Sequence, residues 1–264
     1  MFKQFALAIN DTRRAIKAWH IWLYLSWQDV ISKYRRSIFG PLWIAGGMIA
    51  TSLALSITFG AMQGQPLHDF LPYVMAGLLA WTHFLGLMLI EAPEMFVSVS
   101  GSIRNHAFPF MFYALRFTSR SLILFAHNLV VFIIASACVG NFHIPNWQVI
   151  PALLLLTLFT LTTGPVIGLA SARYRDLRFM LPYIAQILFF MTPVFWTPGK
   201  SHGMRALIVD ANPLYHLMQI LREPLLGQPA PLHSWMVSLG VVSASLLVWL
   251  VVFAAFRRKI PFWV

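Results

Sequence analysis

Side chains that could do chemistry are scarce in this chain and lie mostly between its apolar stretches. Only 8 of the 264 residues are Asp or Glu, and the long apolar stretches contain no Asp, Glu, Lys or Arg. His83 and His127 are the ionisable candidates within them. An isolated histidine at such a position is more often packed neutral against a hydroxyl or carbonyl group than catalytic, because charge at that depth is costly. We therefore expect no catalytic site inside these stretches.

The polar segments carry no recognisable catalytic, metal or cofactor pattern either. No H-E-x-x-H, G-x-S-x-G or phosphate-binding-loop motif occurs. The single cysteine, Cys138, excludes a disulfide framework and a multi-cysteine metal site. One charged cluster, Arg173, Arg175 and Asp176, is more consistent with a structural loop than with an active site. Charged rings and proton-relay chains are missing as well, so if the chain moves a substrate uphill, we expect another subunit to supply the energy.

The composition indicates the class of protein to which the chain belongs. Hydrophobic residues make up 59% of the chain, charged residues 10%, and the mean hydropathy is +0.72. These values exclude a disordered chain and argue against an ordinary water-soluble enzyme. The net charge of +11 does not indicate nucleic-acid binding, because the Lys and Arg residues lie between apolar runs rather than on one solvated face. We expect an all-α integral membrane protein.

Six apolar stretches are candidates to span the bilayer, which takes about 20 residues each. The fifth stretch is short and reaches the length of a span only if residues from about 177 are added to it. The first begins too late in the chain to be a cleavable signal peptide. Alternate connections contain sixteen basic residues on one side and three on the other. This asymmetry predicts that both termini are cytoplasmic. The six stretches are 41–62, 70–90, 121–140, 147–172, 181–196 and 235–256.

Three segments outside the spans have patterns of their own. Residues 2–19 form a cationic amphipathic pattern, typical of an interface helix that serves either as a simple anchor or as a docking surface for a cytoplasmic partner. Residues 91–105 read as a short polar helix on the cytoplasmic side, or else as a solvated loop. Residues 197–234 contain two short apolar pieces separated by 210–213, which predict two re-entrant external helices that form part of a pore or gate, or cap the bundle.

We expect one domain over the whole chain. Its parts are a cytoplasmic interface region (1–40), spans one to five (41–196), an external hairpin (197–234), span six (235–256) and a cytoplasmic tail (257–264).

A series of short motifs resembles a known family. The run 33–43, K-Y-R-R-S-I-F-G-P-L-W, resembles the R-Y-x-x-S-x-L-G-x-x-W signature of membrane subunits of type-2 ABC exporters for polysaccharides, with Phe39 at the usual leucine position. Such exporters carry O-antigen, capsule or teichoic acid. The further matches, in family order, are Phe108-Pro109, the R-x-R-D run 173–176, the F-x-x-S-P-V-like run 189–194 with threonine for serine, the N-P-L run 212–214 and the R-x-x-L-x-G-like run 222–227.

The resemblance implies a homodimer in the bacterial inner membrane, bound to two copies of an ATP-binding cassette subunit that holds ATP and magnesium. The pair would form a channel for a lipid-linked glycan. In the family, the N-terminal helix and the helix after the second span contact the ATPases, and the short external helices form a gate.

The resemblance suggests candidate roles for residues of this chain, and the aromatic faces that a glycan path needs suggest a substrate path. The alternative for each of these aromatic residues is that it faces lipid or a neighbouring helix. The ATPase-coupling residues are Glu91, Glu94, Ser98, Ser102 and Arg104; the interface or entry residues are Lys33, Tyr34, Arg35, Arg36 and Trp43; the cytoplasmic loop contributes Arg173, Arg175 and Asp176; the substrate path is lined by Trp43, Trp81, Phe189, Phe190 and Trp196; and the external gate contains Asn212, Pro213 and Arg222. For Arg222 three roles are open: holding a carbonyl end, pairing with Asp210 or Glu223, or meeting a phosphate of the lipid carrier.

The sequence is also compatible with two other functions. A permease of a drug or small-lipid ABC exporter would share the topology, although the run 33–43 favours a glycan. A membrane-embedded glycan-modifying enzyme would need catalytic residues near a membrane face, where only the 173–176 cluster is a candidate.

Overall fold

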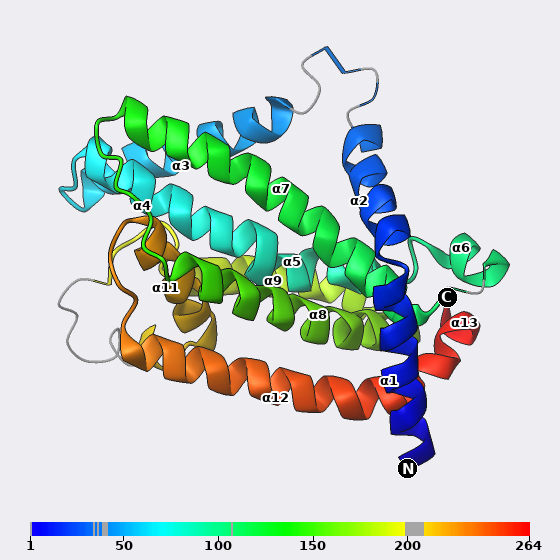
Figure 1. Ribbon diagram of the computed structural model, residues 1–264. Coiled ribbons are helices and arrows are strands. Elements are labelled where there is room, and N and C mark those ends of the chain that lie inside the picture. The colour runs from blue at the N-terminus through cyan, green and yellow to red at the C-terminus, as the bar shows by residue number, and fades with distance from the viewer. Residues whose placement is uncertain (1, 34, 36, 39–41, 107, 199–208) are drawn as a thin grey trace.

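The computed structural model describes all residues except 1, 34, 36, 39–41, 107 and 199–208. The secondary structure of the described residues is entirely helical, which confirms the all-α expectation. Two helices, α1 (Phe2–Lys17) and α2 (Trp19–Lys33), precede the long apolar helix α3 (Leu42–Met62). They lie one after the other across one end of the helix bundle, where both chain termini are found (Figure 1).

Five helical segments are long and apolar enough to cross a membrane: Trp43–Met62, Leu67–Ile90, Phe110–Cys138, Val149–Arg173 and Leu232–Trp263. They confirm five of the six predicted spans. The remaining candidate, α9 (Leu177–Met191), has 15 residues, which at about 1.5 Å per residue gives roughly 22 Å of the roughly 30 Å hydrocarbon core. A sixth span therefore remains a prediction that depends on the residues flanking α9.

The second span is the core of the bundle. It consists of α4 (Leu67–Ala80), a π-helical turn η1 (Trp81–Leu85) and α5 (Gly86–Ile90). Most of its side chains are buried, whereas α3 is largely exposed. Glycine is required directly after the π turn, because a Cβ atom at Gly86 would lie 2.5 Å from the indole nitrogen of Trp81. The widened turn lets the Trp81 ring pack against the helix that carries it.

The third span begins earlier than the apolar pattern predicts. α7 covers Phe110–Cys138, so that it includes Arg116 and Arg120, which the sequence places in the preceding connection. The helix tolerates these two arginines because each has a carboxylate partner elsewhere in the chain, Asp29 of α2 for Arg116 and Glu91, directly after α5, for Arg120. α8 (Val149–Arg173) and α12 (Leu232–Phe256) follow the predicted stretches closely.

The connection between the second and third spans is not one polar helix. It divides into a 3₁₀ turn η2 (Ala92–Glu94), a series of turns and the short helix α6 (Ser100–Asn105). The segment is interrupted because Met95 and Phe96 turn inward and are almost fully buried. Of the two alternatives open for this connection, each describes a part: 100–105 is a short polar helix, and the residues before it form turns.

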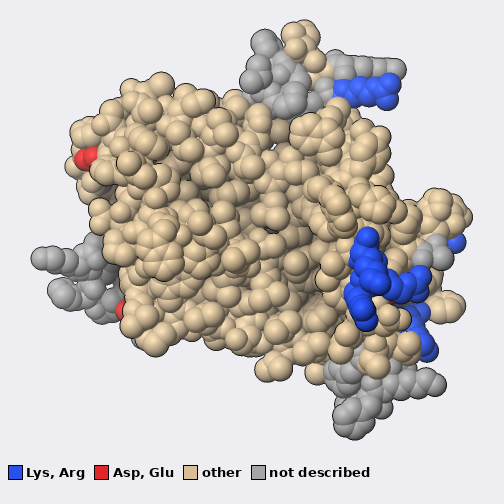
Figure 2. All heavy atoms as spheres, in the orientation of Figure 1, with Lys and Arg blue, Asp and Glu red and all other residues tan. Residues whose placement is uncertain are grey.

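Positive charge is concentrated at the end of the bundle that carries α1. Figure 2 shows most of the visible Lys and Arg atoms there, while the visible Asp and Glu atoms lie at the opposite end. The 3₁₀ turn η3 (Arg257–Lys259) and helix α13 (Ile260–Trp263), which end the chain, lie at this end too. We call it the basic end, and the other the opposite end.

The N-terminal helix α1 caps a membrane span. The carboxylate of Asp11 accepts hydrogen bonds from the backbone N–H groups of Phe110 (3.2 Å) and Met111 (2.9 Å), at the start of α7. These N–H groups have no partner within the helix itself. Burial raises the pKa of the Asp11 carboxyl above its ordinary value, and the two backbone hydrogen bonds oppose that shift. The contact fixes α1 across the basic end.

We expect Asp11→Ala to lower the free energy of unfolding by about 1 kcal/mol, the usual loss for a helix N-cap. Thermal melting of the purified protein in detergent measures it. Asn10→Ala is the matched control, since Asn10 is an exposed neighbour on the same helix. Equal melting temperatures for the two variants would contradict a capping role.

At the opposite end, α11 (Pro213–Leu225) begins where the sequence predicts a break. The Asn212 side chain accepts a hydrogen bond from the N–H of Leu214 (3.0 Å), and its amide donates to the Thr192 hydroxyl (2.9 Å). Pro213 occupies the first turn, where its missing N–H costs nothing. The other predicted short helix, 204–209, lies mostly outside the described residues.

Candidate functional site

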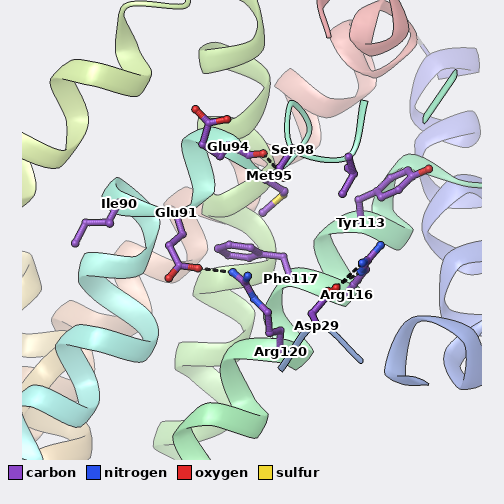
Figure 3. Close-up of a pocket in the computed structure, with 11 residues that line it drawn as sticks. Asp29, Ile90, Glu91, Glu94, Met95, Ser98, Tyr113, Arg116, Phe117 and Arg120 are labelled. Atoms are coloured by element: carbon purple, nitrogen blue, oxygen red, sulfur yellow. Dashed lines mark hydrogen bonds and ion pairs between the residues drawn. The ribbon is translucent and has the colours of Figure 1, made fainter. Parts of the chain in front are cut away.

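A cavity lined by several charged side chains lies at the basic end, among α2, α5, η2 and α7. Its volume is about 490 Å³. Figure 3 shows charged side chains from three separate parts of the chain pointing into it. Its polar lining consists of Asp29, Glu91, Glu94, Ser98, Tyr113, Arg116 and Arg120.

Two arginines of α7 hold the walls of this cavity together. Arg116 donates two hydrogen bonds to Asp29 of α2, from Nε to Oδ2 (2.8 Å) and from Nη2 to Oδ1 (2.6 Å). Arg120, one helical turn later, forms an ion pair with Glu91 at the end of the second span. Paired contacts of the Arg116–Asp29 kind fix orientation as well as distance. α7 therefore ties helix α2 to the connection that follows the second span.

A third ion pair reaches the start of α9. Arg178 Nη1 lies 3.3 Å from an oxygen of Glu94, whose side chain is 48% exposed. An ion pair this open to solvent adds little stability, typically about 1 kcal/mol or less. The Glu94 carboxylate thus remains accessible at the surface of the chain.

The connection is held in place by two glycines of α8. A Cβ atom at Gly164 would lie 2.8 Å from Cε of Met95, and one at Gly168 would lie 3.0 Å from the Phe96 ring. The small-residue spacing Gly164-x-x-x-Gly168 therefore accommodates the two apolar side chains of the connection. This contact fixes the backbone from which Glu91 and Glu94 project.

A smaller cavity of about 290 Å³ adjoins the first, because Glu91 lines both. His83 and Asn128 also line it, and their side-chain nitrogens Nε2 and Nδ2 are 3.0 Å apart. The Ser121 hydroxyl donates to the main-chain oxygen of His83 (2.6 Å). His83 is thus packed within the bundle against an amide, close to the expectation of a hydroxyl or carbonyl partner. His127, the other candidate, has a buried Nε2 without a hydrogen-bond partner in the described part of the chain.

The structure brings together only part of the predicted coupling set. Glu91, Glu94 and Ser98 line the large cavity, but Ser102 and Arg104 lie beyond it on α6. The Ser102 hydroxyl is 3.2 Å from that of Tyr113, and Arg104 donates to the main-chain oxygen of Val264. The sequence reasoning missed four lining residues: Asp29, Tyr113, Arg116 and Arg120.

A signal for these missed residues was present. Asp29 is one of only eight acidic residues, and it lies in an aromatic-rich segment. Arg116 and Arg120 are four positions apart, which places them on one helical face. In so apolar a chain, the few acidic residues are the expected partners of Arg116 and Arg120.

The predicted entry residues are only partly described. Tyr34 and Arg36 lie outside the described residues, and of Lys33 only the backbone, at the end of α2, is described. Arg35 and Trp43 are exposed.

Of the three residues predicted to form a cytoplasmic loop, Arg173 ends α8, while Arg175 and Asp176 lie between α8 and α9; all three are exposed. Arg173 lies over the rings of Tyr174 (5.5 Å from guanidinium carbon to ring centroid) and Trp263 (5.9 Å). Asp176 precedes the first turn of α9 without a side-chain cap hydrogen bond.

The aromatic residues assigned to the substrate path differ in exposure. Trp81 is 6% exposed and packs against Phe189, with ring centroids 5.3 Å apart. Phe190 is 57% exposed, and its main-chain oxygen accepts a hydrogen bond from the indole N–H of Trp196 (3.2 Å). Of these residues, Trp43 and Phe190 therefore have the largest exposed fractions, 58% and 57%.

Arg222 is the most completely buried charged residue described, at 1% exposure. Its Nη1 donates to the main-chain oxygen of Pro193 and its Nη2 to the side-chain oxygen of Gln219, each at 2.6 Å. The guanidinium carbon lies 4.2 Å from the centroid of the Tyr73 ring. Of the three roles open for Arg222, these contacts favour the one in which it holds a main-chain carbonyl group. Glu223 accepts a hydrogen bond from Gln219, which in turn accepts one from Arg222.

Comparison with known proteins identifies the class of this helical bundle. Residues 21–226 match the model of the ABC-2 type transporter family, and the chain belongs to that family. It is a multi-pass membrane protein and a permease subunit, not an enzyme, which removes the glycan-modifying alternative. The chain is also 22% identical over 225 residues to the O-antigen export system permease protein RfbA of Myxococcus xanthus, covering 83% of this chain and 85% of that relative.

Proposed function

We propose that this chain is the channel-forming subunit of an ATP-driven exporter that moves a lipid-linked polysaccharide, of O-antigen or capsule type, across the inner membrane. The observation that carries the proposal is the similarity to an O-antigen export permease over most of both chains. The ordered motifs from 33–43 to 222–227 support it. The functional unit is a homodimer with two ATP-binding cassette subunits, which bind ATP and magnesium.

The large cavity at the basic end is the proposed contact site for the ATPase. Its walls come from α2, the connection after the second span and the start of α7, so force applied there would reach two membrane spans. Glu94 and Ser98 lie at its exposed part. The ion pairs Arg116–Asp29 and Arg120–Glu91 connect α7 to α2 and to the connection after the second span.

We propose six spans with both termini in the cytoplasm, so that the basic end faces the cytoplasm. Single cysteines test this in a Cys138→Ser background. A membrane-impermeant thiol reagent added to intact cells is expected to label positions 65 and 202 but not positions 14 and 176. Permeabilised cells serve as the control, in which all four positions should react. Labelling of position 14 in sealed cells would contradict the orientation.

The cargo is tested by removing the chain from cells that export a surface polysaccharide. We expect the lipid-linked polysaccharide to accumulate at the inner face of the inner membrane and to disappear from the surface, with restoration by a plasmid copy of the chain. Normal surface polysaccharide combined with sensitivity to small toxic compounds would instead indicate a drug exporter.

A further inference from the structure

A third cavity at the basic end has no part in the proposed coupling site. It has a volume of about 320 Å³ and lies between the ends of α8 and α12 and the short helices η3 and α13. Its floor is aliphatic and is formed by Val166, Leu169 and Val252. α8 and α12 are both candidate membrane spans, so this floor continues the apolar surface of the bundle toward the basic end.

Two cations stand among the lining residues, each held by aromatic rings. Arg173 lies over Tyr174 and Trp263, and the amino group of Lys259 is 5.4 Å from the centroid of the Phe256 ring. Such cation–aromatic contacts fix the position of the guanidinium or ammonium group but leave its positive charge without a counter-charge. No carboxylate lines the cavity, and the ion pairs found among the described residues include neither cation.

This combination matches one class of ligand. An apolar floor suits an acyl chain, aromatic rings are typical of the headgroup level, and paired basic residues between helices on the cytoplasmic side bind anionic headgroups. We propose that the cavity binds an anionic phospholipid of the surrounding bilayer, with its phosphate between Arg173 and Lys259 and an acyl chain along the floor. The site does not depend on which cargo the exporter carries.

The bound lipid would also connect to the element after the second span. Trp263 of the cavity precedes Val264, whose main-chain oxygen accepts a hydrogen bond from Arg104 of α6. A lipid packed against Trp263 therefore holds α13 in position to contact α6. The chain thus offers a route by which anionic lipid content stabilises the connection that lines the coupling cavity.

Native mass spectrometry of the purified full-length chain in detergent tests the site, with phosphatidylglycerol and phosphatidylcholine as probes. Each cation near an anionic headgroup contributes about a fivefold gain in affinity. We therefore expect Arg173→Gln with Lys259→Gln to weaken phosphatidylglycerol binding roughly 25-fold. The control Arg175→Gln with Arg258→Gln removes the same charge from exposed neighbours outside the cavity, and should change binding much less. Equal losses in the two double variants, or equal binding of both lipids to the unmodified chain, would overturn the proposal.

A second measurement needs no variant. A photoreactive phosphatidylglycerol should crosslink to peptides that contain Tyr174 or Trp263, and unlabelled phosphatidylglycerol should compete with it. Crosslinks confined to other helices would contradict the site. Displacement by a polyprenyl diphosphate at a tenth of the phosphatidylglycerol concentration would assign the cavity to a glycan carrier and reject the phospholipid proposal.

Discussion

Replacing Arg222 with alanine should lower the free energy of unfolding by about 3 kcal/mol, because it removes two charge-assisted hydrogen bonds from a buried position and leaves their two acceptors unpaired. The Pro193 carbonyl and the Gln219 side chain would both lose their donor. Tyr73 of the core helix α4 would lose the cation packed against its ring. Three segments at the opposite end, around 73, 193 and 222, would then separate more easily.

Thermal melting in detergent, together with the amount of protein in the membrane, measures this loss. The melting temperature of Arg222→Lys should lie between those of Arg222→Ala and the unmodified chain, because an ammonium group lacks the planar fork that reaches two acceptors. Arg175→Ala, at an exposed arginine, should melt like the unmodified protein. A stable Arg222→Ala protein that had lost only its affinity for the lipid carrier would contradict the structural role and favour the phosphate-binding one.

Reversing the charge of Glu94 has the second largest expected effect, this time on coupling rather than stability. We expect Glu94→Lys to reduce polysaccharide export roughly tenfold or more, since coupling between two sites is typically 1–3 kcal/mol. ATP hydrolysis by the complex should continue. Protein level and melting temperature should change little, because the Glu94–Arg178 pair is partly exposed.

The charge swap Glu94→Lys with Arg178→Glu separates the two possible causes of that loss. It restores an ion pair within the chain but leaves the reversed charge facing the ATPase. If Glu94 acts on the partner, the swapped protein remains defective in export. Recovery of normal export by the swap would show that Glu94 only holds α9, and would contradict its role in coupling.

The sequence predicts those features of the fold that are local. Apolar stretches near 20 residues identify five of the spans, because hydrophobicity over one segment decides whether it is a span. The start of α11 follows equally from Asn212-Pro213, whose capping chemistry lies within two residues. In both cases no distant partner is needed.

Features that depend on distant partners could not be predicted in this way. Arg116 marks a polar connection in the sequence, yet it lies in α7 because Asp29, 87 residues away, satisfies its charge. The connection 91–105 reads as polar, but Met95 and Phe96 are buried because α8 presents glycines opposite them. The same applies to Arg222, whose partner at Pro193 is 29 residues away.

We propose that this permease moves a lipid-linked polysaccharide with energy from a partner ATPase. The rate of ATP hydrolysis by the complex tests this most directly. The chain would be co-purified with its ATP-binding cassette subunit, reconstituted in lipid, and assayed for ATP hydrolysis with and without a lipid-linked glycan. The account predicts that hydrolysis rises with the glycan and that Glu94→Lys abolishes the rise without abolishing the basal rate. A rate that is insensitive to the glycan but rises with a small apolar compound would contradict it.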